Sequence, residues 1–243
     1  MAKLHLQVSN LDFTNWQSNL ATAAIIFISW SFAPFSYAVS VSGTHFNAHM
    51  GMLFLYELLL AFSLVLQLNN HFQSQLANLL IILSGLCAIF GFITTPLIMF
   101  LLLLLPIFMA LMQLPQLNLQ SEAGLLTFGA LLMLTIPIGD AYTSLHFISW
   151  EIVLFLLPIM TSTWCFLTPF FLPRSKKRSW LLLGTLVILV ASLFTRPINS
   201  LTIFAIVLAL GWWLFTMDKR LAEPSLILTS LVQMLVIILI YWN

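Results

Sequence analysis

The segment THFNAHMGMLFLYELLLAF, residues 44–62, carries the side chains of this chain that are best suited to chemistry. His45 and His49 are four residues apart, so on a helix they share one face and could ligate one metal ion together. Imidazole suits Cu, Zn, Fe and Ni, and the thioether of Met50 shifts the preference towards Cu(I). Glu57 follows two turns later, about 80° around the helix, and could support an imidazole from beneath.

A second group of such residues lies in IPIGDAYTSLHFISWE, after another apolar run. Asp140 precedes His146 in what we expect to be a loop, and Glu151 lies at the start of the next apolar run. An acid inside a membrane span is costly and usually marks function or pairing, which applies here to Glu57 and Glu151. The alternative is that these histidines are interfacial anchors or helix caps with no ligand.

The composition indicates which elements must position these residues. Of the 243 residues, 61% are hydrophobic and only 6% are charged, whereas a soluble domain is about 25% charged. Apolar stretches of about 20 residues recur along the chain, and each is long enough to cross a bilayer as a helix. We therefore predict an all-α, polytopic integral membrane helix bundle, with a polar tail over residues 1–18 and one membrane domain over residues 19–243. The net charge of +1 argues against a nucleic-acid partner.

The apolar stretches predict about nine transmembrane helices, within a range of seven to nine. Two of the spans are almost continuous, but a single helix over residues 75–113 would be about 58 Å long, against a hydrocarbon core of ~30 Å. The sequence GFITTP, with Gly91 and Pro96, is where this run must turn. The predicted spans are 19–41, 48–68, 75–93, 96–113, 124–141, 146–170, 179–195, 198–216 and 224–242.

Basic residues predict the orientation. The sequence PRSKKRS follows the sixth predicted span and MDKR follows the eighth, two crossings later. One orientation places both in the cytoplasm, as the positive-inside rule requires, and it places the N-terminus there too. The loops with His45, His49 and His146 then lie at the outer face of the cell inner (plasma) membrane.

Signatures of common enzymes are missing from the sequence. It contains no GxSxG, HExxH or Walker A motif. Cys87 and Cys165 lie inside apolar runs and form no CxxC motif. We therefore do not expect an enzyme.

The sequence APFSYAVSVSGTHFNAHMGMLFL resembles the CtaG-type cytochrome c oxidase assembly proteins, which are small polytopic proteins associated with copper delivery. In that family a proline ends one helix and a segment with the HxxxHM spacing follows, as Pro34 is followed here by His45 and His49. A later family segment, LHxxEHxxFLLxxxxxWWP, resembles LHFISWEIVLFLLPIMTSTWCFLTP, in which His146 and Trp164 match.

This resemblance implies an assembly factor that assists copper insertion into cytochrome c oxidase at the outer membrane face. The expected partners are membrane lipid and the respiratory-chain oxidase subunit that carries the copper site. The implied metal ligands are His45, His49, His146 and Met50, and the acids that would support them are Glu57, Glu151 and Asp140.

Two other functions remain open from the sequence. The number of spans, together with Glu57 and Glu151, also fits a permease or small-molecule transporter subunit, in which both acids would line a cavity. The nearly all-apolar spans fit a structural accessory subunit of a membrane complex, in which neither the histidines nor the acids matter beyond stability.

Overall fold

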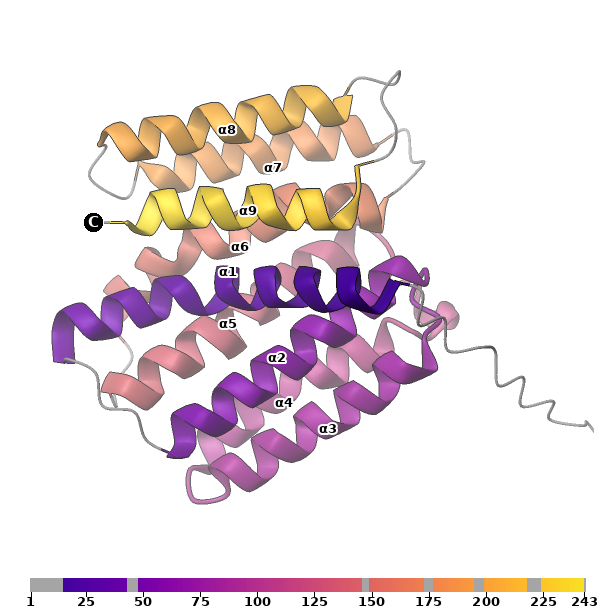
Figure 1. The fold of residues 1–243 in the computed structure, drawn as a ribbon, viewed down its shortest axis with the longest axis vertical. Coiled ribbons are helices and arrows are strands. Elements are labelled where there is room, and N and C mark those ends of the chain that lie inside the picture. The colour runs from indigo at the N-terminus through magenta and orange to yellow at the C-terminus, as the bar shows by residue number, and fades with distance from the viewer. Residues whose placement is uncertain are drawn as a thin grey trace, which may run out of the picture.

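The protein is described here from a computed structural model that covers residues 15–42, 48–145, 149–172, 177–194, 199–217 and 224–242. Within these ranges the chain forms nine α-helices, one short 3₁₀ helix and no strand (Figure 1). The prediction of an all-α fold is confirmed for this part of the chain.

Each helix matches one of the apolar stretches. Helix α1 begins at Trp16, inside the predicted tail, and it continues past Pro34. The bounds are α1 Trp16–Ser42, α2 Ala48–Asn69, α3 Gln75–Phe92, α4 Pro96–Leu111, the 3₁₀ helix Pro115–Leu117, α5 Glu122–Leu145, α6 Trp150–Phe171, α7 Arg178–Leu193, α8 Ser200–Met217 and α9 Leu226–Tyr241.

Six of the helices in the described ranges, α1, α2, α3, α5, α6 and α8, are long and apolar enough to cross a membrane. The other three, α4, α7 and α9, are apolar but have 16 residues each. At 1.5 Å per residue they are about 24 Å long, which is less than the ~30 Å hydrocarbon core. The structure thus supports a membrane protein with six candidate spans, while nine crossings stay a prediction.

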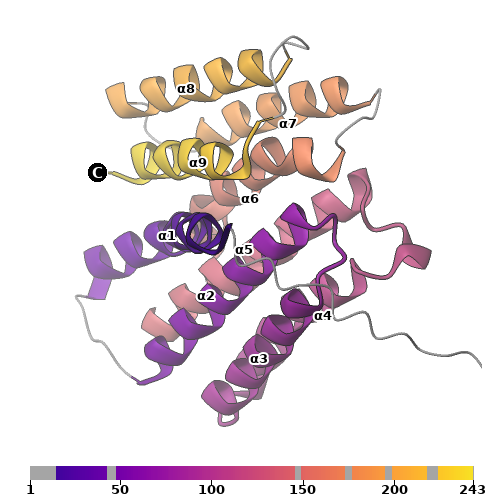
Figure 2. The same ribbon diagram turned by 45° about the vertical axis from the view of Figure 1, so that its right-hand side comes forward.

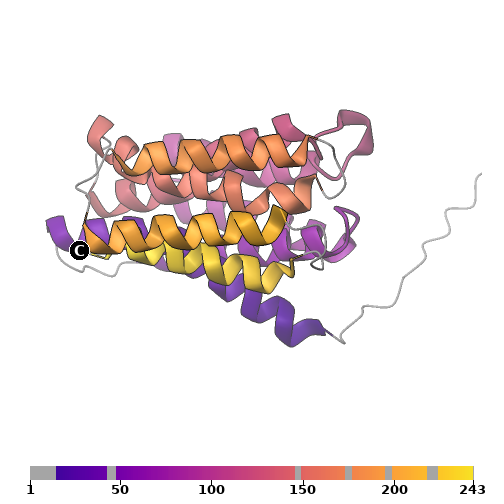
Figure 3. The same cartoon turned by 90° about the horizontal axis from the view of Figure 1, so that it is seen from above.

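The helices run alongside one another in a bundle, as the view from above shows (Figure 3). Helices α2, α3 and α4 lie at one end and α7, α8 and α9 at the other, with α1, α5 and α6 between them (Figures 1 and 2). Helix α1 contacts α2, α5 and α9, and α5 contacts α4 and α6. The middle of the bundle is therefore where segments distant in sequence meet.

Large apolar side chains on α3, α4 and α8 point out of the bundle. Phe90, Leu97 and Leu214 are 70%, 68% and 62% exposed. Soluble proteins rarely expose apolar side chains in contiguous patches, so these helices fit contact with lipid. Inside the bundle, Trp30, Tyr56, Phe128 and Phe166 are the largest fully buried side chains.

Candidate functional site

The middle of α2 places a carboxyl group in the core of the bundle. Glu57 is completely buried, and its Oε2 accepts a hydrogen bond of 2.5 Å from the Ser31 hydroxyl of α1. The Ser31 hydroxyl also lies 3.0 Å from the backbone carbonyl of Phe27. Because this hydroxyl has a single proton, it can donate to an ionised Glu57, or donate to Phe27 and accept from a protonated Glu57. The contact therefore suits both protonation states of the acid.

Asp140 of α5 brings a second carboxyl group to Glu57. It is 5% exposed, and Glu57 lies close enough for the two carboxyl groups to interact electrostatically. An ionised carboxylate can only accept hydrogen bonds, so two of them can bond to each other only when one holds a proton. Two negative charges this close in an apolar interior are also costly. Burial of the two acids side by side thus disfavours the state in which both are ionised.

Neighbouring polar residues hold α2 in the orientation that aims Glu57 at α1 and α5. The buried Tyr56 hydroxyl donates a 2.6 Å hydrogen bond to the Leu102 carbonyl of α4, and Thr135 of α5 lies beside it. Further along α2, Gln67 Nε2 donates a 2.9 Å hydrogen bond to the Met109 carbonyl of α4. Because consecutive helical residues point about 100° apart, bonding Tyr56 to α4 turns Glu57 towards the other helices.

The predicted histidine site is described only at His49. This residue lies at the exposed start of α2, and its Nδ1 is 2.8 Å from the Gly91 carbonyl of α3. A carbonyl only accepts, so Nδ1 carries the proton, and in a neutral ring Nε2 keeps its lone pair. A Cβ on Gly91 would lie 3.0 Å from Met52 Cβ, which shows how closely α2 and α3 approach here.

The structure does not bring the predicted metal ligands together in the ranges it describes. His45 and His146 lie outside those ranges. Met50 is 8% exposed and packs inward, whereas His49 is exposed. Among the described residues, no group of three or more histidine, cysteine, aspartate or glutamate side chains could hold a metal ion. Copper binding stays a prediction.

The placements of the acids were partly wrong. Asp140 was expected in a loop, but α5 continues to Leu145 with Pro137 inside it, so Asp140 is a buried helical residue. Glu151 was expected inside a span, and it lies at the very start of the candidate span Trp150–Phe171, exposed in the first turn of α6 after the Ser149 cap, where a carboxylate suits the positive end of the helix dipole. Glu57 is where it was predicted, yet it faces Ser31 and Asp140.

Sequence reasoning missed Ser31 as the partner of Glu57, and Tyr56 and Gln67 as the residues that bond α2 to α4. A helix of apolar residues in a membrane can carry hydroxyl groups that bond only to its own backbone, so a serine or tyrosine by itself gives no signal. The one signal in the sequence was Glu57 itself. An acid inside a membrane helix is costly, so a polar partner on another helix was to be expected.

The chain matches no protein-family model, and no curated protein or solved structure is significantly similar to it. The resemblance to the CtaG-type family therefore rests on the short motifs alone.

Proposed function

We propose that the protein is a proton-coupled membrane carrier for a small molecule, with Glu57 and Asp140 as its proton-binding site. The observation that supports this most strongly is the buried carboxyl pair where α1, α2 and α5 meet. Ionisable residues inside membrane helices typically mark ion pathways and proton relays. This develops the transporter function left open by the sequence, with Asp140 in the role expected of Glu151.

The pair links its protonation to the packing of three helices. With one proton, Glu57 and Asp140 can bond to each other and Ser31 completes the site. When that proton leaves, two carboxylates face each other in an apolar core, which favours a second arrangement in which α2 and α5 separate and water or a cation enters. A carrier needs a group of helices with two arrangements, and binding of the coupling ion must shift the balance between them.

Transport by the reconstituted protein tests this proposal. Proteoliposomes with an imposed pH gradient are incubated with a mixture of small metabolites, and mass spectrometry measures which solutes accumulate inside. We expect at least one solute to accumulate only with the wild-type protein and only while the gradient lasts. Glu57→Gln and Asp140→Asn should each abolish this accumulation, because each removes one carboxyl of the proton site.

Glu151→Gln is the matched control, since Glu151 is an exposed acid in the first turn of α6. It should leave the accumulation unchanged. If no solute accumulates in response to the gradient, or if all three variants behave like the wild type, the carrier proposal is wrong. A structural accessory subunit would then be the better interpretation.

A second candidate function, copper handling for oxidase assembly, is favoured by one observation at His49. The hydrogen bond from Nδ1 to the Gly91 carbonyl orients the ring and leaves Nε2 for a ligand, which is the arrangement common at metal sites. In this function His45, His49, His146 and Met50 would hold Cu(I), and the partner would be an oxidase subunit. Purified His45→Ala/His49→Ala protein should then lose copper, whereas His71→Ala, which changes an exposed histidine elsewhere, should retain it.

We also propose a location in the cell inner (plasma) membrane, with nine crossings and the N-terminus in the cytoplasm. The basic sequences after α6 and α8 support this orientation. Reporter fusions after each helix would test it. Reporters active on the cytoplasmic side after both α6 and α8 are expected, and opposite sides for these two fusions would contradict the proposed topology.

A further inference from the structure

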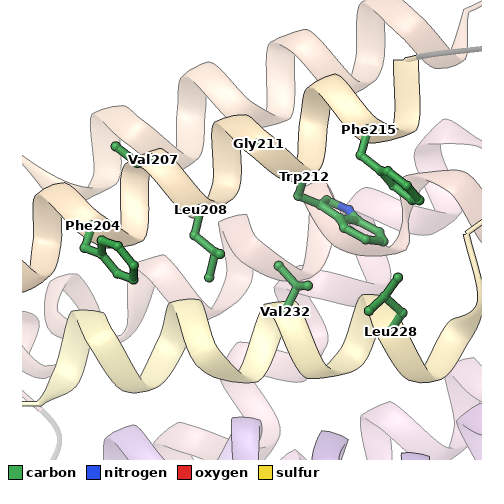
Figure 4. A pocket seen from close by; sticks show the side chains of 8 residues that line it. All are labelled: Phe204, Val207, Leu208, Gly211, Trp212, Phe215, Leu228 and Val232. Carbon is green, nitrogen blue, oxygen red and sulfur yellow. The ribbon is translucent and has the colours of Figure 1, made fainter.

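The outside and the inside of the bundle offer different kinds of feature. On the outside, α8 and α9 form a groove lined mainly by apolar side chains, a surface that fits contact with lipid (Figure 4). Inside, α4 packs against α3 and α5. Helix α2 reaches the backbone of α4 through two polar side chains, Tyr56 and Gln67. These two contacts are specific enough to carry an inference.

Pro106 interrupts the hydrogen bonding of α4. A proline has no backbone N–H, so inside an α-helix it leaves the carbonyl four residues earlier without its usual donor, and its ring crowds that carbonyl. In α4 this carbonyl belongs to Leu102, and both residues are buried. The backbone of α4 therefore resists bending least between Leu102 and Pro106.

The Tyr56 hydroxyl of α2 supplies the donor that Pro106 lacks. It donates a 2.6 Å hydrogen bond to the Leu102 carbonyl, and Tyr56 is completely buried. Membrane helices tolerate a proline when a neighbouring helix satisfies the freed backbone group. The hydrogen bonding of α4 at Pro106 therefore depends on the position of α2.

Helix α2 also bonds to α4 on the other side of the proline. Gln67 Nε2 donates a 2.9 Å hydrogen bond to the Met109 carbonyl. This carbonyl lies in the last turn of α4, where the backbone N–H of Gln113 bonds to the Ala110 carbonyl instead. The segments before and after Pro106 are thus each bonded to α2.

We propose that Pro106 is a hinge of α4 and that the Tyr56 hydroxyl holds this hinge in one conformation. While the bond is made, α4 is one helix from Pro96 to Leu111. When α2 moves and the hydroxyl leaves, the Leu102 carbonyl stays buried without a donor, which is costly. Bending of α4 at the proline then lets this carbonyl find another partner.

The hinge lies next to the carboxyl pair. Tyr56 precedes Glu57 on α2, and Thr135 of α5 lies beside the Tyr56 hydroxyl. In the proposed carrier α2 and α5 separate when the pair loses its proton, and the same movement withdraws Tyr56 from α4. This coupling rests on the proposed function, whereas the hold of Tyr56 on the hinge does not.

A double-mutant cycle in equilibrium unfolding of the full chain in detergent tests the bond. Tyr56→Phe removes only the hydroxyl and should raise the unfolding equilibrium constant about tenfold, because the Leu102 carbonyl stays buried and unpaired. Pro106→Ala restores a backbone N–H for that carbonyl. In the Pro106→Ala background, Tyr56→Phe should therefore raise the constant less than about threefold.

Tyr241→Phe is the matched control. Tyr241 of α9 is also buried, and its hydroxyl donates an equally short bond of 2.6 Å to the Phe155 carbonyl of α6. That carbonyl lies four residues before Ile159, which has an N–H, so the cost of Tyr241→Phe should not depend on Pro106→Ala. Equal costs of Tyr56→Phe in both backgrounds would overturn the proposal. If Tyr56→Phe does not fold by itself, Pro106→Ala should restore folding, and no recovery would equally contradict it.

Spin labels at two exposed positions of α4 measure the bending. Leu97 and Leu111 are 68% and 38% exposed, and they lie about 21 Å apart along the helix. We expect one narrow distance distribution in the otherwise wild-type protein, a broader or shorter one with Tyr56→Phe, and a narrow one again with Tyr56→Phe/Pro106→Ala. An unchanged distribution with Tyr56→Phe would show that Tyr56 does not hold a hinge.

Neither measurement involves transport, so the hinge and the carrier can fail separately. A protein that accumulates no solute but gives the expected cycle and distances has the hinge without the carrier. A protein that transports but gives equal costs and unchanged distances is a carrier without this hinge.

Discussion

The two halves of the bundle bury polar side chains of different kinds. The acidic core, which consists of Ser31, Glu57 and Asp140, lies where α1, α2 and α5 meet. Its two carboxyl groups can gain or lose a proton. The second region, called the hydroxyl seam, consists of three hydroxyl residues and one amide, Thr161, Thr163, Ser192 and Gln233. It joins α6, α7 and α9 through neutral groups. Both regions bring helices together, but only the acidic core can change its charge.

The hydrogen bonds of the hydroxyl seam are mostly local. Thr163 donates to the Ile159 carbonyl of its own helix at 2.8 Å, and Ser192 donates to that of Leu189 at 2.7 Å. Between helices, the Thr161 and Ser192 hydroxyls are 3.1 Å apart, and Gln233 Nε2 lies 3.5 Å from Thr163 Oγ1. These neutral groups keep the same hydrogen bonds at any pH, so nothing in this region favours a second arrangement of the helices. Burial of a polar group alone therefore does not identify a functional site.

The largest difference between the two regions should be spectroscopic. Infrared spectra of the wild type at neutral pH should contain a protonated-carboxyl C=O stretch from the shared proton. The Glu57→Gln/Asp140→Asn double variant should lose this band completely, whereas Gln233→Leu in the hydroxyl seam should keep it. Identical spectra for the wild type and the double variant would mean that the acidic core holds no proton.

The second largest effect is expected where α5, which carries part of the acidic core, contacts α6, which carries part of the hydroxyl seam. Gly129 of α5 faces Trp164 of α6, whose Nε1 donates to the Leu126 carbonyl at 3.0 Å. A Cβ on Gly129 would lie 2.4 Å from that nitrogen, so Gly129→Ala must displace the ring. We expect a loss of about 3 kcal/mol in the free energy of unfolding in detergent. Gly184→Ala, where the added Cβ meets open space, is the control and should change it little.

Removing one hydroxyl from each region compares how much stability is contributed by a hydrogen bond to a carboxyl group and by one between neutral groups. Ser31→Ala deletes the donor to Glu57 and should cost about 2 kcal/mol of stability, as for hydrogen bonds to charged groups. Thr163→Val deletes a neutral bond between helices and should cost about 0.6 kcal/mol. Equal losses in equilibrium unfolding would remove the energetic distinction between the regions.

The smallest effect is expected at an ion pair outside both regions. Lys177 Nζ lies 3.2 Å from Glu122 Oε1, and the two side chains are 75% and 39% exposed. Exposed ion pairs contribute little because water and salt screen them, so Lys177→Gln should cost about 0.5 kcal/mol or less. A loss of stability as large as that expected for Ser31→Ala would show that the contribution of a polar contact to stability does not depend on its burial.

Helix positions could be predicted closely, but the acids could not all be placed. The helices α2 and α6 begin within a few residues of predicted spans, because an apolar run is visible wherever it occurs. Asp140 was expected in a loop, but α5 continues through Pro137 to Leu145, because a proline can lie inside a membrane helix when its neighbours satisfy the freed backbone groups. Glu151 lies at the exposed start of its candidate span and not deeper in it, because the predicted span began four residues before α6 does.

The sequence by itself determined that this chain is a set of apolar helices able to cross a membrane. Hydropathy adds up residue by residue, so no knowledge of neighbouring helices is needed. Only the tertiary structure decided that Glu57 meets Asp140 and Ser31, because the facing of a helix depends on how it packs against segments far away in the chain. That facing places Glu57 beside a serine and a second acid in the core of the bundle.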